Sequence, residues 1–553
     1  MNLCRVTTEP HPILGCTPAR LLRATGSPTA WNNNHGRIIA AVLLVAFSAV
    51  LPAEPDITFT ELWHWGPVAN SHPELTDIWS APASARIFDT NDDGFVNEED
   101  DPSLIFISGN SMPTVCQDSG TSPTACHTGI LRALNGRTGD EQYSLDKVSE
   151  NSSGFAGISV AVGDILGNGT IQIVAVTGEG DLVLIGSNNS PPLMESMQLL
   201  RTSDTPLPDA SSASFGSGGA LALGDMDADS SLEIAYGSSV YDTTDEAIEL
   251  RFIGTSGIGG TSSANAISAF AELNGSSGIE LVSGRTAYAA DGSILWDRSD
   301  LQDGFVAVAD INGNGGAEVV LISGGSANVL DGASGSTLLG PKALAGTGSG
   351  GPPVLADFDG DNLLEIGVAM AGQYSVLDPN FGTSMLDLLW QKQTHDLSSS
   401  QTGSTAFDFD DDGQDEVIEA DQCFLWVFDG ATGGVRLALP HTSTTSNEMP
   451  ITTDIDGDGR AELVMISNGA DPEFWRCING DLEPVTVNGI TWVSSGVGSG
   501  AYRGVSVLNA ASGEWPDALT LWNQHTFRTN SDSFRLGGIE VLIYSDGYEQ
   551  REP

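Results

Sequence analysis

VAVADINGNGGAEVVLIS, from Val306 to Ser323, is the stretch that decides the fold of this chain. An apolar run leads into a loop of acids, amides and glycines, and a second apolar run rich in Val, Ile and Leu follows. PITTDIDGDGRAELVMIS, from Pro450 to Ser467, repeats this pattern closely. Short β-branched runs on either side of a glycine-rich loop predict two strands joined by a tight connection. Self-similarity of this kind is typical of repeat architectures.

The same acidic loop recurs along the chain. Clear copies begin at Asp225, Asp310, Asp357, Asp408 and Asp454, and weaker copies begin at Asp89, Asp164 and Glu272. After the second strand, copies continue with a strand, an Asn-Gly or Asp-Gly turn and another strand, as in LRALNGRTGD and LWVFDGATGGVRL. These dipeptides supply the positive φ values that tight hairpins need. Each unit is therefore predicted to hold four strands, with the acidic loop between the first and the second.

The spacing of the units separates the possible all-β architectures. Most copies start roughly 40–50 residues apart, which is the length of a four-stranded propeller blade. An array of β-sandwiches or a solenoid would also turn often, but regular loop-bearing hairpins without linkers favour the propeller. We predict an all-β β-propeller of four-stranded blades over residues 54–530. Eight blades are favoured over seven because eight loops are present.

The acids of the loop fall at positions that suit a calcium ion. In the last copy, Asp454, Asp456, Asp458 and Glu462 occupy positions 1, 3, 5 and 9. Side chains at such positions of a tight loop converge, and Ca²⁺ takes six to eight oxygen ligands. No nitrogen or sulfur ligand for a transition metal is present. A hydrogen-bonded turn alone needs one Asp rather than four spaced acids. We therefore predict several structural Ca²⁺ ions.

The predicted ligands occupy positions 1, 3, 5 and 9 of the other clear copies. They are Asp225, Asp227, Asp229 and Glu233; Asp310, Asn312, Asn314 and Glu318; Asp357, Asp359, Asp361 and Glu365; and Asp408, Asp410, Asp412 and Glu416. The Asp310 copy carries only two charges and is expected to bind more weakly. Leu166 and Gln172 break the pattern in the Asp164 copy, so no ion is expected there. The Glu272 copy leaves the question open.

The first copy has different spacing. Asp89, Asn91, Asp93 and Asp100 stand at positions 1, 3, 5 and 12, with an apolar Val96 at position 8. This is the spacing of an EF-hand loop, in which position 12 is usually Glu. We predict an EF-hand-like calcium loop inserted into the first blade.

At these loops the sequence resembles the FG-GAP/VCBS-repeat proteins, whose blades build the integrin α-subunit propeller. The segment WPDALTLWNQHTF, from Trp515 to Phe527, is similar to the closing segment of large bacterial exported members. The resemblance implies a propeller whose calcium loops are structural and lie away from the main ligand surface. It does not imply one ligand, because members include adhesins and polysaccharide-active enzymes. The FG and GAP tags are nearly absent, with Gly154 to Gly157 the nearest trace.

The charge balance excludes some partners. The chain has 73 acidic and 21 basic residues and a net charge of −52. A binder of nucleic acid needs the opposite sign, and so does a protein attracted to anionic membranes. We therefore expect neither partner, and no membrane insertion beyond the leader.

Residues 1–53 are predicted to be a leader. Arg37 is followed by an uncharged apolar run from Ile38 to Leu51, which is shorter than the ~20 residues of a membrane span. Such a run fits the core of a signal peptide with cleavage near Ala53, and a signal-anchor stays open. We expect a secreted or cell-surface protein, with residues 531–553 as a short tail.

The cysteines agree with export. Cys116, Cys126, Cys423 and Cys477 follow the leader, and an even number in an exported chain indicates disulfides. Cys116 and Cys126 flank a polar loop that a bridge could close. Cys423 and Cys477 follow equivalent strands in successive repeats, and the pairing stays open at this point.

Known catalytic motifs are absent from the sequence: no G-x-S-x-G, H-E-x-x-H or phosphate-binding loop occurs. His64 and His525 lie beside tryptophans and are candidates for a general base, but we favour a packed Trp/His cluster. We therefore expect a noncatalytic adhesion or recognition module for an extracellular protein or glycan. A secreted polysaccharide lyase or hydrolase on the same scaffold, and a structural envelope or matrix component, are the alternatives.

Overall fold

Apolar runs of three to nine residues, broken by glycine-rich turns, give strands and almost no helix. The computed structural model describes residues 57–526 apart from 67–71, 74, 110–128, 151, 153, 190–191, 209–217, 230, 245, 262–264, 276–277, 398–401, 444–446, 469–476, 479–482 and 494–502. The chain divides into two units, Met1–Glu54 and Pro55–Pro553, and the first lies wholly outside the described residues. The leader therefore stays a prediction.

In the described part of the chain the strands form eight antiparallel sheets of four or five strands and one two-stranded sheet. The first strands of the sheets are β3 (Ala83–Ala85), β7 (Ala161–Gly163), β11 (Ala222–Gly224), β15 (Ala269–Ala271), β19 (Phe305–Ala309), β23 (Val354–Ala356), β27 (Ser404–Phe407) and β31 (Ile451–Thr453). The second strands are β4 (Ser103–Gly109), β8 (Gln172–Val176), β12 (Glu233–Tyr236), β16 (Glu280–Ser283), β20 (Glu318–Ser323), β24 (Glu365–Met370), β28 (Glu416–Ala420) and β32 (Glu462–Ser467).

The outer half of each sheet follows the same order. The third strands are β5 (Ile130–Asn135), β9 (Leu182–Ser187), β13 (Ser239–Thr243), β17 (Thr286–Tyr288), β21 (Ser326–Asp331), β25 (Gln373–Asn380), β29 (Phe424–Phe428) and β35 (Gly504–Ala510). The fourth strands are β6 (Glu141–Leu145), β10 (Met197–Thr202), β14 (Ile248–Ile253), β18 (Ile294–Asp297), β22 (Thr337–Ala343), β26 (Met385–Gln393), β30 (Val435–Pro440) and β1 (Phe59–Trp65).

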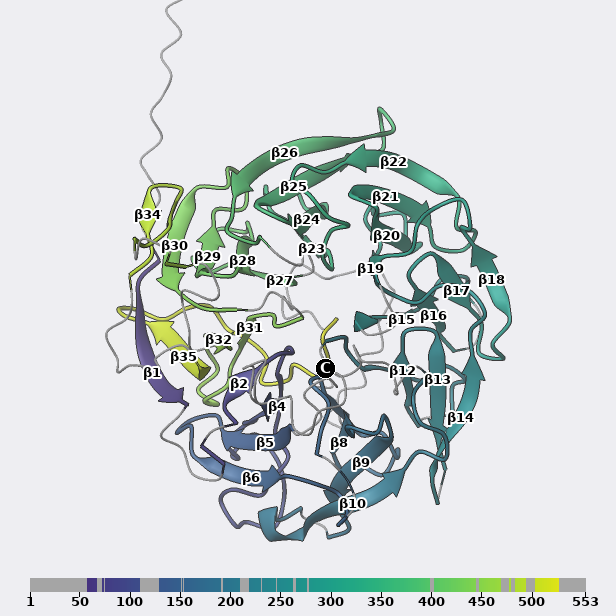
Figure 1. Ribbon diagram of the computed structural model, residues 1–553, viewed down its shortest axis with the longest axis vertical. Coiled ribbons are helices and arrows are strands. Elements are labelled where there is room, and N and C mark those ends of the chain that lie inside the picture. The colour runs from purple at the N-terminus through teal and green to yellow at the C-terminus, as the bar shows by residue number, and fades with distance from the viewer. Residues whose placement is uncertain are drawn as a thin grey trace, which may run out of the picture. The chain divides into compact units, whose positions relative to one another are not determined.

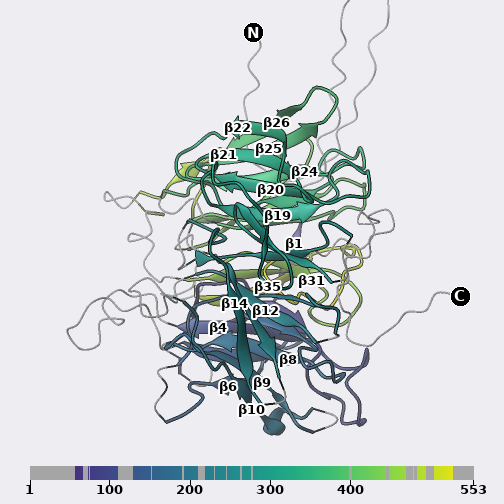
Figure 2. The same cartoon turned by 90° about the vertical axis from the view of Figure 1, so that its right-hand side faces the viewer.

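The eight sheets are the blades of a β-propeller, numbered 1 to 8 here from the sheet that contains β3. They stand in a ring in Figure 1, and the first strand of each blade contacts the first strand of the next. In Figure 2, β22, β21, β20 and β19 of blade 5 follow one another inward from the rim. The prediction of eight four-stranded blades is confirmed.

The ring is closed by a strand from the opposite end of the chain. β1 is the fourth strand of blade 8 and pairs with β35, from Phe59 opposite Ala510 to Trp65 opposite Val505. This joins the start of the folded unit to its end, so blade 8 cannot form until both parts of the chain are made. Small additions are β2 (Asp77–Ile78), which also pairs with β4, the hairpin of β33 (Thr486–Val487) and β34 (Ile490–Thr491), and one 3-10 turn, η1 (Met194–Ser196).

The hydrophobic core is divided among the spaces between neighbouring blades. Each pair of adjacent sheets encloses its own cluster of buried apolar side chains. Second and third strands are buried on both faces, which explains their continuous apolar runs. The apolar area buried at these interfaces makes the main stabilising contribution to the ring, at roughly 25 cal/mol per Å².

A tryptophan latch joins certain blades to the next. An indole N–H on the fourth strand of one blade donates to the carbonyl of the turn glycine in the next, at 2.5–2.7 Å. The pairs are Trp63 with Gly136, Trp296 with Gly332, and Trp390 with Gly430. The Asn-Gly and Asp-Gly turns seen in the sequence therefore connect neighbouring blades as well as two strands.

The segment after β35 crosses the first strands of several blades. Trp522 exchanges two backbone hydrogen bonds of 2.9 Å with Ser84 of blade 1, and the carbonyl of Asn523 accepts from Val162 of blade 2. The side-chain oxygen of Gln524 accepts from the backbone of Leu223 in blade 3. This end of the described chain, yellow in Figure 1, lies near the middle of the ring. The segment WPDALTLWNQ is therefore part of the scaffold.

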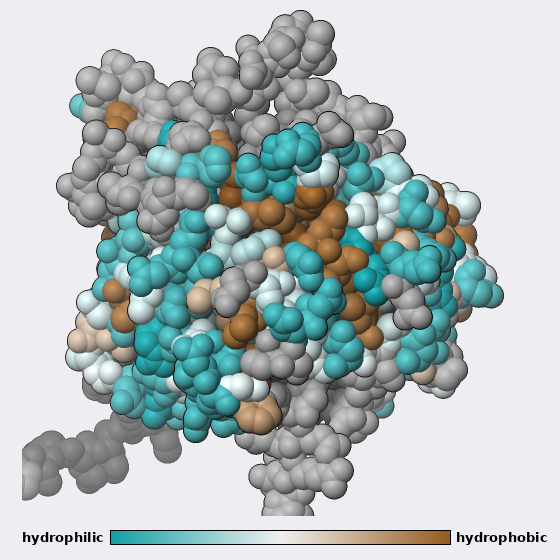
Figure 3. All heavy atoms as spheres, turned by 90° about the horizontal axis from the view of Figure 1, so that it is seen from below, coloured by the Kyte–Doolittle hydropathy of each residue, from teal (hydrophilic) through white to brown (hydrophobic). Residues whose placement is uncertain are grey.

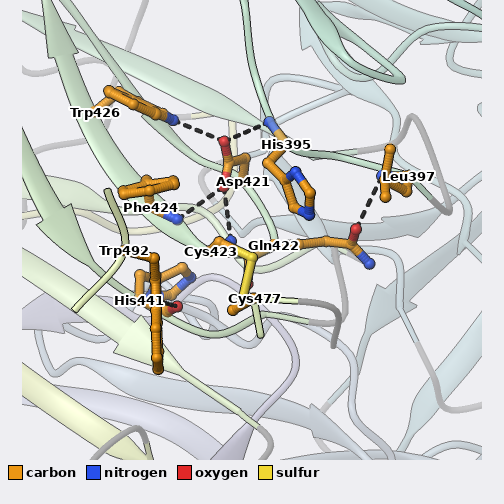
Figure 4. The surroundings of a disulfide bond; sticks show 10 residues. All are labelled: His395, Leu397, Asp421, Gln422, Cys423, Phe424, Trp426, His441, Cys477 and Trp492. Carbon is orange, nitrogen blue, oxygen red and sulfur yellow. Dashed lines mark hydrogen bonds between the residues drawn. A yellow bond between two sulfur atoms is a disulfide. The ribbon is translucent and has the colours of Figure 1, made fainter. Parts of the chain in front are cut away.

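A disulfide joins Cys423 to Cys477, which settles the pairing that the sequence left open. Both half-cystines are fully buried. Figure 4 shows the bridge beside Asp421, whose carboxylate accepts hydrogen bonds from the backbone of Cys423, Phe424 and His395 and from the indole of Trp426. The bridge anchors the segment around Cys477 to the turn after β28. The proposed partners Cys116 and Cys126 lie outside the described residues.

No helix among the described residues is both long and apolar enough to cross a membrane.

Candidate metal centres

All eight acidic loops lie where the sequence predicts them, between the first and second strands of their blades. The loop of blade 8 shows the common geometry. Asp454 accepts hydrogen bonds from the backbone N–H groups of Asp458 and Gly459, at 3.0 and 3.1 Å. Asp456 accepts from Asp458 at 3.1 Å. The aspartates thus hold the loop backbone in a tight turn by accepting its N–H groups, and each keeps oxygen lone pairs for a further partner.

The Glu at position 9 starts the second strand and turns back under the loop. One of its oxygens, Oε2, accepts the backbone N–H of position 2, as in Phe358 to Glu365 at 2.7 Å and Ile455 to Glu462 at 3.0 Å. Six of the loops share this bond, with Glu233, Glu280, Glu318, Glu365, Glu416 and Glu462 as acceptors. These six glutamates are 3% exposed or less. The loops differ in which donor, if any, hydrogen-bonds to the second carboxylate oxygen, Oε1.

Four loops bring three carboxylates within 4.8 Å of one another. The groups are Asp225, Asp227 and Asp229; Asp357, Asp359 and Asp361; Asp408, Asp410 and Glu416; and Asp454, Asp456 and Glu462. Carboxylates so close repel one another unless a cation or a proton lies between them. All four groups consist of oxygen donors, the ligand type of calcium.

Blades 6 and 8 have room for a cation. Oε1 of Glu365 and Oε1 of Glu462 accept no hydrogen bond within the described part of the chain, although both side chains are 1% exposed. Burial, together with the adjacent aspartates, raises the pKa of each glutamate to about 9. A buried carboxylate with an unsatisfied oxygen beside two further acids fits a divalent cation. The residues of these two loops therefore fit calcium.

Blades 3 and 7 already contain a cation from the protein. Arg436 on β30 donates to Glu416 Oε1 at 2.6 Å and to Asp410 Oδ2 at 2.9 Å. Arg251 on β14 donates to Glu233 Oε1 at 3.0 Å and to Asp227 Oδ2 at 2.8 Å. The acids at positions 3 and 9 of these two loops are thus paired with an arginine of the chain, and their role as calcium ligands stays a prediction.

Blades 4 and 5 use neutral donors. The amide of Asn274 donates to Glu280 Oε1 at 2.8 Å, and the amide of Asn312 donates to Glu318 Oε1. The amide oxygen of Asn312 also accepts the N–H of Asn314 at 3.0 Å, which fixes its orientation. Neither loop forms a group of three clustered carboxylates among the described residues.

Blades 1 and 2 differ most from the other six. In blade 2, Gln172 replaces the glutamate and bonds to Thr170 and Leu166 of its own loop. In blade 1, Asp100 accepts backbone N–H groups from Thr90 and Asn97 at 2.6 and 2.8 Å. Asp100 thus stabilises the loop backbone, and the three aspartates Asp89, Asp93 and Asp100 are not among the clustered carboxylate groups of the described residues.

The sequence analysis missed the two arginines. Both occupy one column of the fourth strand, where LRF (250–252) and VRL (435–437) stand against ELW (61–63), ILW (294–296) and LLW (388–390). Aligning the fourth strands as well as the loops would have marked them as exceptions. Their contact with the loops depends on the twist of the sheet, which no alignment shows.

The two histidines singled out as possible bases are packed side chains. His525 is 5% exposed, and burial lowers its pKa to about 4. His64 is half-buried on β1, its Nδ1 lies 3.0 Å from Ser506 Oγ, and burial lowers its pKa. Both imidazoles are thus largely withdrawn from solvent, and their packing against tryptophans stays a prediction.

Comparisons with known proteins confirm the fold. No protein-family model and no curated protein sequence matches the chain. The crystal structure of the V. cholerae biofilm matrix protein Bap1 aligns over 85% of this chain and 94% of its own, with a TM-score of 0.60 and 17% identity. The exotype rhamnogalacturonan lyase YesX and the Bacillus licheniformis rhamnogalacturonan lyase PL11 each align over 74% of both chains at 14% identity, with TM-scores of 0.48 and 0.47. At such identities the likeness to Bap1 shows the propeller fold alone.

Proposed function

We infer that this protein is an exported, calcium-stabilised propeller of the FG-GAP/VCBS type that acts as a noncatalytic recognition module for an extracellular protein or glycan. One observation carries the calcium part: Glu365 and Glu462 are buried, each has an oxygen that accepts no hydrogen bond from the described residues, and each lies near further carboxylates. Two ions are proposed, held by the acidic loops of blades 6 and 8. Their ligands are Asp357, Asp359, Asp361 and Glu365, and Asp454, Asp456, Asp458 and Glu462.

Export is supported by the disulfide between Cys423 and Cys477, because such bonds persist outside the reducing cytosol. It also suits the calcium proposal, since extracellular modules bind Ca²⁺ with Kd values of about 10⁻⁴–10⁻³ M. The N-terminal leader remains the proposed route of export.

Recognition is favoured over catalysis because basic groups are few and four of the arginines are used in ion pairs within the fold. Arg132 is fully buried and pairs with Glu141, Arg251 and Arg436 lie in acidic loops, and Arg503 pairs with the buried Asp77. A lyase acting on an acidic polysaccharide needs cationic groups in an open cleft, and these arginines cannot supply one. Bap1 is a biofilm matrix protein, and a matrix role is compatible with the same proposal.

The outer strands offer apolar contact surface. Figure 3 shows brown apolar groups between hydrophilic ones on one face of the molecule. Ile253, Ile294 and Met385 lie on fourth strands and are 48%, 43% and 55% exposed. Apolar side chains on an acidic surface suit a partner that combines apolar and cationic or hydroxyl groups.

The calcium proposal is tested by thermal unfolding of the exported chain in EDTA and in about 1 mM calcium. We expect calcium to raise the melting temperature of the wild type, and Glu365→Gln to remove part of the rise. Glu246→Gln changes an exposed glutamate outside the loops and serves as control. Equal melting temperatures of the wild type in EDTA and in calcium would contradict the proposal.

The recognition proposal is tested with an array of glycans and matrix proteins, probed in calcium and in EDTA. Every glycan that binds is then incubated with the protein and assayed for new reducing ends. Binding without turnover is the expected result. New reducing ends would select a polysaccharide-active enzyme instead.

A further inference from the structure

Every blade has a β-bulge at the same place on its fourth strand. One residue there has no partner on the third strand, and the register shifts around it. The extra residues, from blade 1 to blade 8, are Gln142, Leu200, Arg251, Leu295, Leu338, Leu389, Arg436 and Leu62. Bulges redirect side chains. The extra residue is leucine in five blades, arginine in two and glutamine in one.

The bulged side chain approaches the first residue of the second strand, where the position-9 Glu stands. In blade 1, Gln142 Oε1 accepts from Ser103 Oγ at 2.7 Å, and Ser103 begins β4. In blade 2, a Cβ built on Gly186 would meet Leu200 at 2.9 Å and Gln172 at 3.1 Å, so these two side chains flank one point. The bulge is therefore a fixed position facing the acidic loop.

In blades 3 and 7 this position carries a guanidinium. The Arg436 side chain is 5% exposed and bridges Glu416 and Asp410, while Arg251 is 20% exposed and bridges Glu233 and Asp227. Arg251 also donates to the carbonyl of Ala290 in blade 4 at 2.9 Å, which fixes its position further. The oxygens held are Glu Oε1 and Asp Oδ2, at the loop positions that in blade 8 belong to the clustered Asp456 and Glu462.

Arginine and calcium exclude each other at one site. Both are cations that need the same oxygens, and placing them together adds repulsion that grows as the site is shielded from water. Leucine at the bulge in blades 6 and 8 adds no charge and donates no hydrogen bond to the loop. Arg86 and Arg137 of blade 1 lie close enough to the loop of blade 8 to act electrostatically on Asp454 and Asp456, but their guanidinium groups hydrogen-bond to other groups. Where the loop keeps its full set of acids, as in blades 3, 6, 7 and 8, the residue at the bulge thus decides whether those acids are paired with a cation of the chain itself.

We propose that Arg251 and Arg436 are built-in substitutes for calcium, so that the acidic loops of blades 3 and 7 are metal-independent although their sequences look complete. The proposal rests on the proposed function, in which the loops of blades 6 and 8 hold calcium. In the four blades whose loops keep the full set of acids, the bulge residue then determines metal occupancy, and two sites lying four blades apart need no ion.

The first test removes the arginine side chain from the acidic loop. Arg251→Met and Arg436→Met keep an unbranched, flexible side chain and delete the guanidinium and its charge. Each variant is dialysed to equilibrium in about 1 mM free calcium, and its calcium content is measured by elemental analysis. We expect each variant to bind about one ion more than the wild type, because the vacated acids then form a complete site. An unchanged content in a folded variant overturns the proposal.

The second test does not depend on the arginine variants folding. Asp227→Asn changes an arginine-held loop and should leave the calcium content unchanged, whereas Asp359→Asn in blade 6 should lower it by about one ion. Loss of an ion in Asp227→Asn would show that Arg251 does not exclude calcium, and would overturn the proposal. Leu389→Arg, which places an arginine at the bulge of blade 6, should mimic Asp359→Asn.

The two proposals fail in different ways. A wild-type protein without calcium whose Arg251→Met variant gains an ion would refute the metal sites of blades 6 and 8 and keep the role of the arginine. Hydrogen exchange gives a reading by blade: EDTA should increase exchange in 354–365 and 451–462 and leave 222–233 and 404–416 unchanged. Equal increases in all four segments would overturn the role of the arginines.

Discussion

Trp296 of β18 donates its indole N–H to the carbonyl oxygen of Gly332 at 2.7 Å, and this bond joins blade 4 to blade 5. The ring of Trp296 also lies against Gly335 of the same turn, which has a φ of +67°. The Asp-Gly turn is thus held both by a hydrogen bond and by contact with an aromatic face. The same arrangement recurs at Trp63 and Trp390.

Replacing Trp296 by Phe removes the donor and leaves the buried carbonyl of Gly332 without its partner. We expect the free energy of unfolding to fall by about 1–3 kcal/mol. Urea unfolding in saturating calcium measures it, so that metal binding is constant. Ile294→Val on the same strand is a control, since Ile294 is exposed, and should change stability by less than about 0.5 kcal/mol. Equal effects of both changes would show that the latch contributes nothing.

Replacing Gly335 by Ala tests the aromatic contact of the latch. A Cβ at this position would lie 2.7 Å from the ring of Trp296. Gly513→Ala is a matched control, because Gly513 has a φ of +81° but no heavy atom within 4 Å of such a Cβ. Both variants should lose about 1 kcal/mol from the backbone conformation. Gly335→Ala should lose a further 1–3 kcal/mol, roughly, from overpacking, measured in the same unfolding assay.

The disulfide should stabilise the ring through the loop that it closes. Cys423 and Cys477 are 54 residues apart, and closing a loop of that length is worth about 4 kcal/mol in the chain-entropy model. The double substitution of both cysteines by alanine should lower the free energy of unfolding by about that amount. Mass spectrometry of the intact wild type must show the bridged peptide. A bridge between other cysteines in that peptide map would contradict the pairing.

Acidification should destabilise the protein through His525. Burial lowers the pKa of His525 from 6.5 to about 4. Between these two pH values the unfolded chain therefore binds a proton that the folded chain does not bind. The contribution to stability is complete above pH 6.5 and is lost as pH falls toward 4. His525→Gln should therefore lose less stability than the wild type between pH 7 and pH 5 in urea unfolding. An identical loss in both proteins would show that His525 titrates normally.

Much of the fold follows from residues close together in the sequence. The loops at Asp225, Asp357 and Asp454 and the strands beside them predict blades because their patterns are local and repeated. Cys423 and Cys477 are recognisable as candidates for the same reason. Their pairing is not, since four cysteines after the leader allow several pairings and only the positions of blades 7 and 8 select one.

The sequence by itself determined the propeller, the number of blades and the place of each acidic loop, because alternating apolar runs and glycine turns act over a few residues. The tertiary structure decided which loop carboxylates are paired with an arginine. Arg251 lies 18 residues beyond Glu233 in the chain, and Arg436 lies 20 beyond Glu416. Only the bulge and the pairing of four strands bring each guanidinium to its carboxylates, and that contact, rather than the loop sequence, settles the local charge.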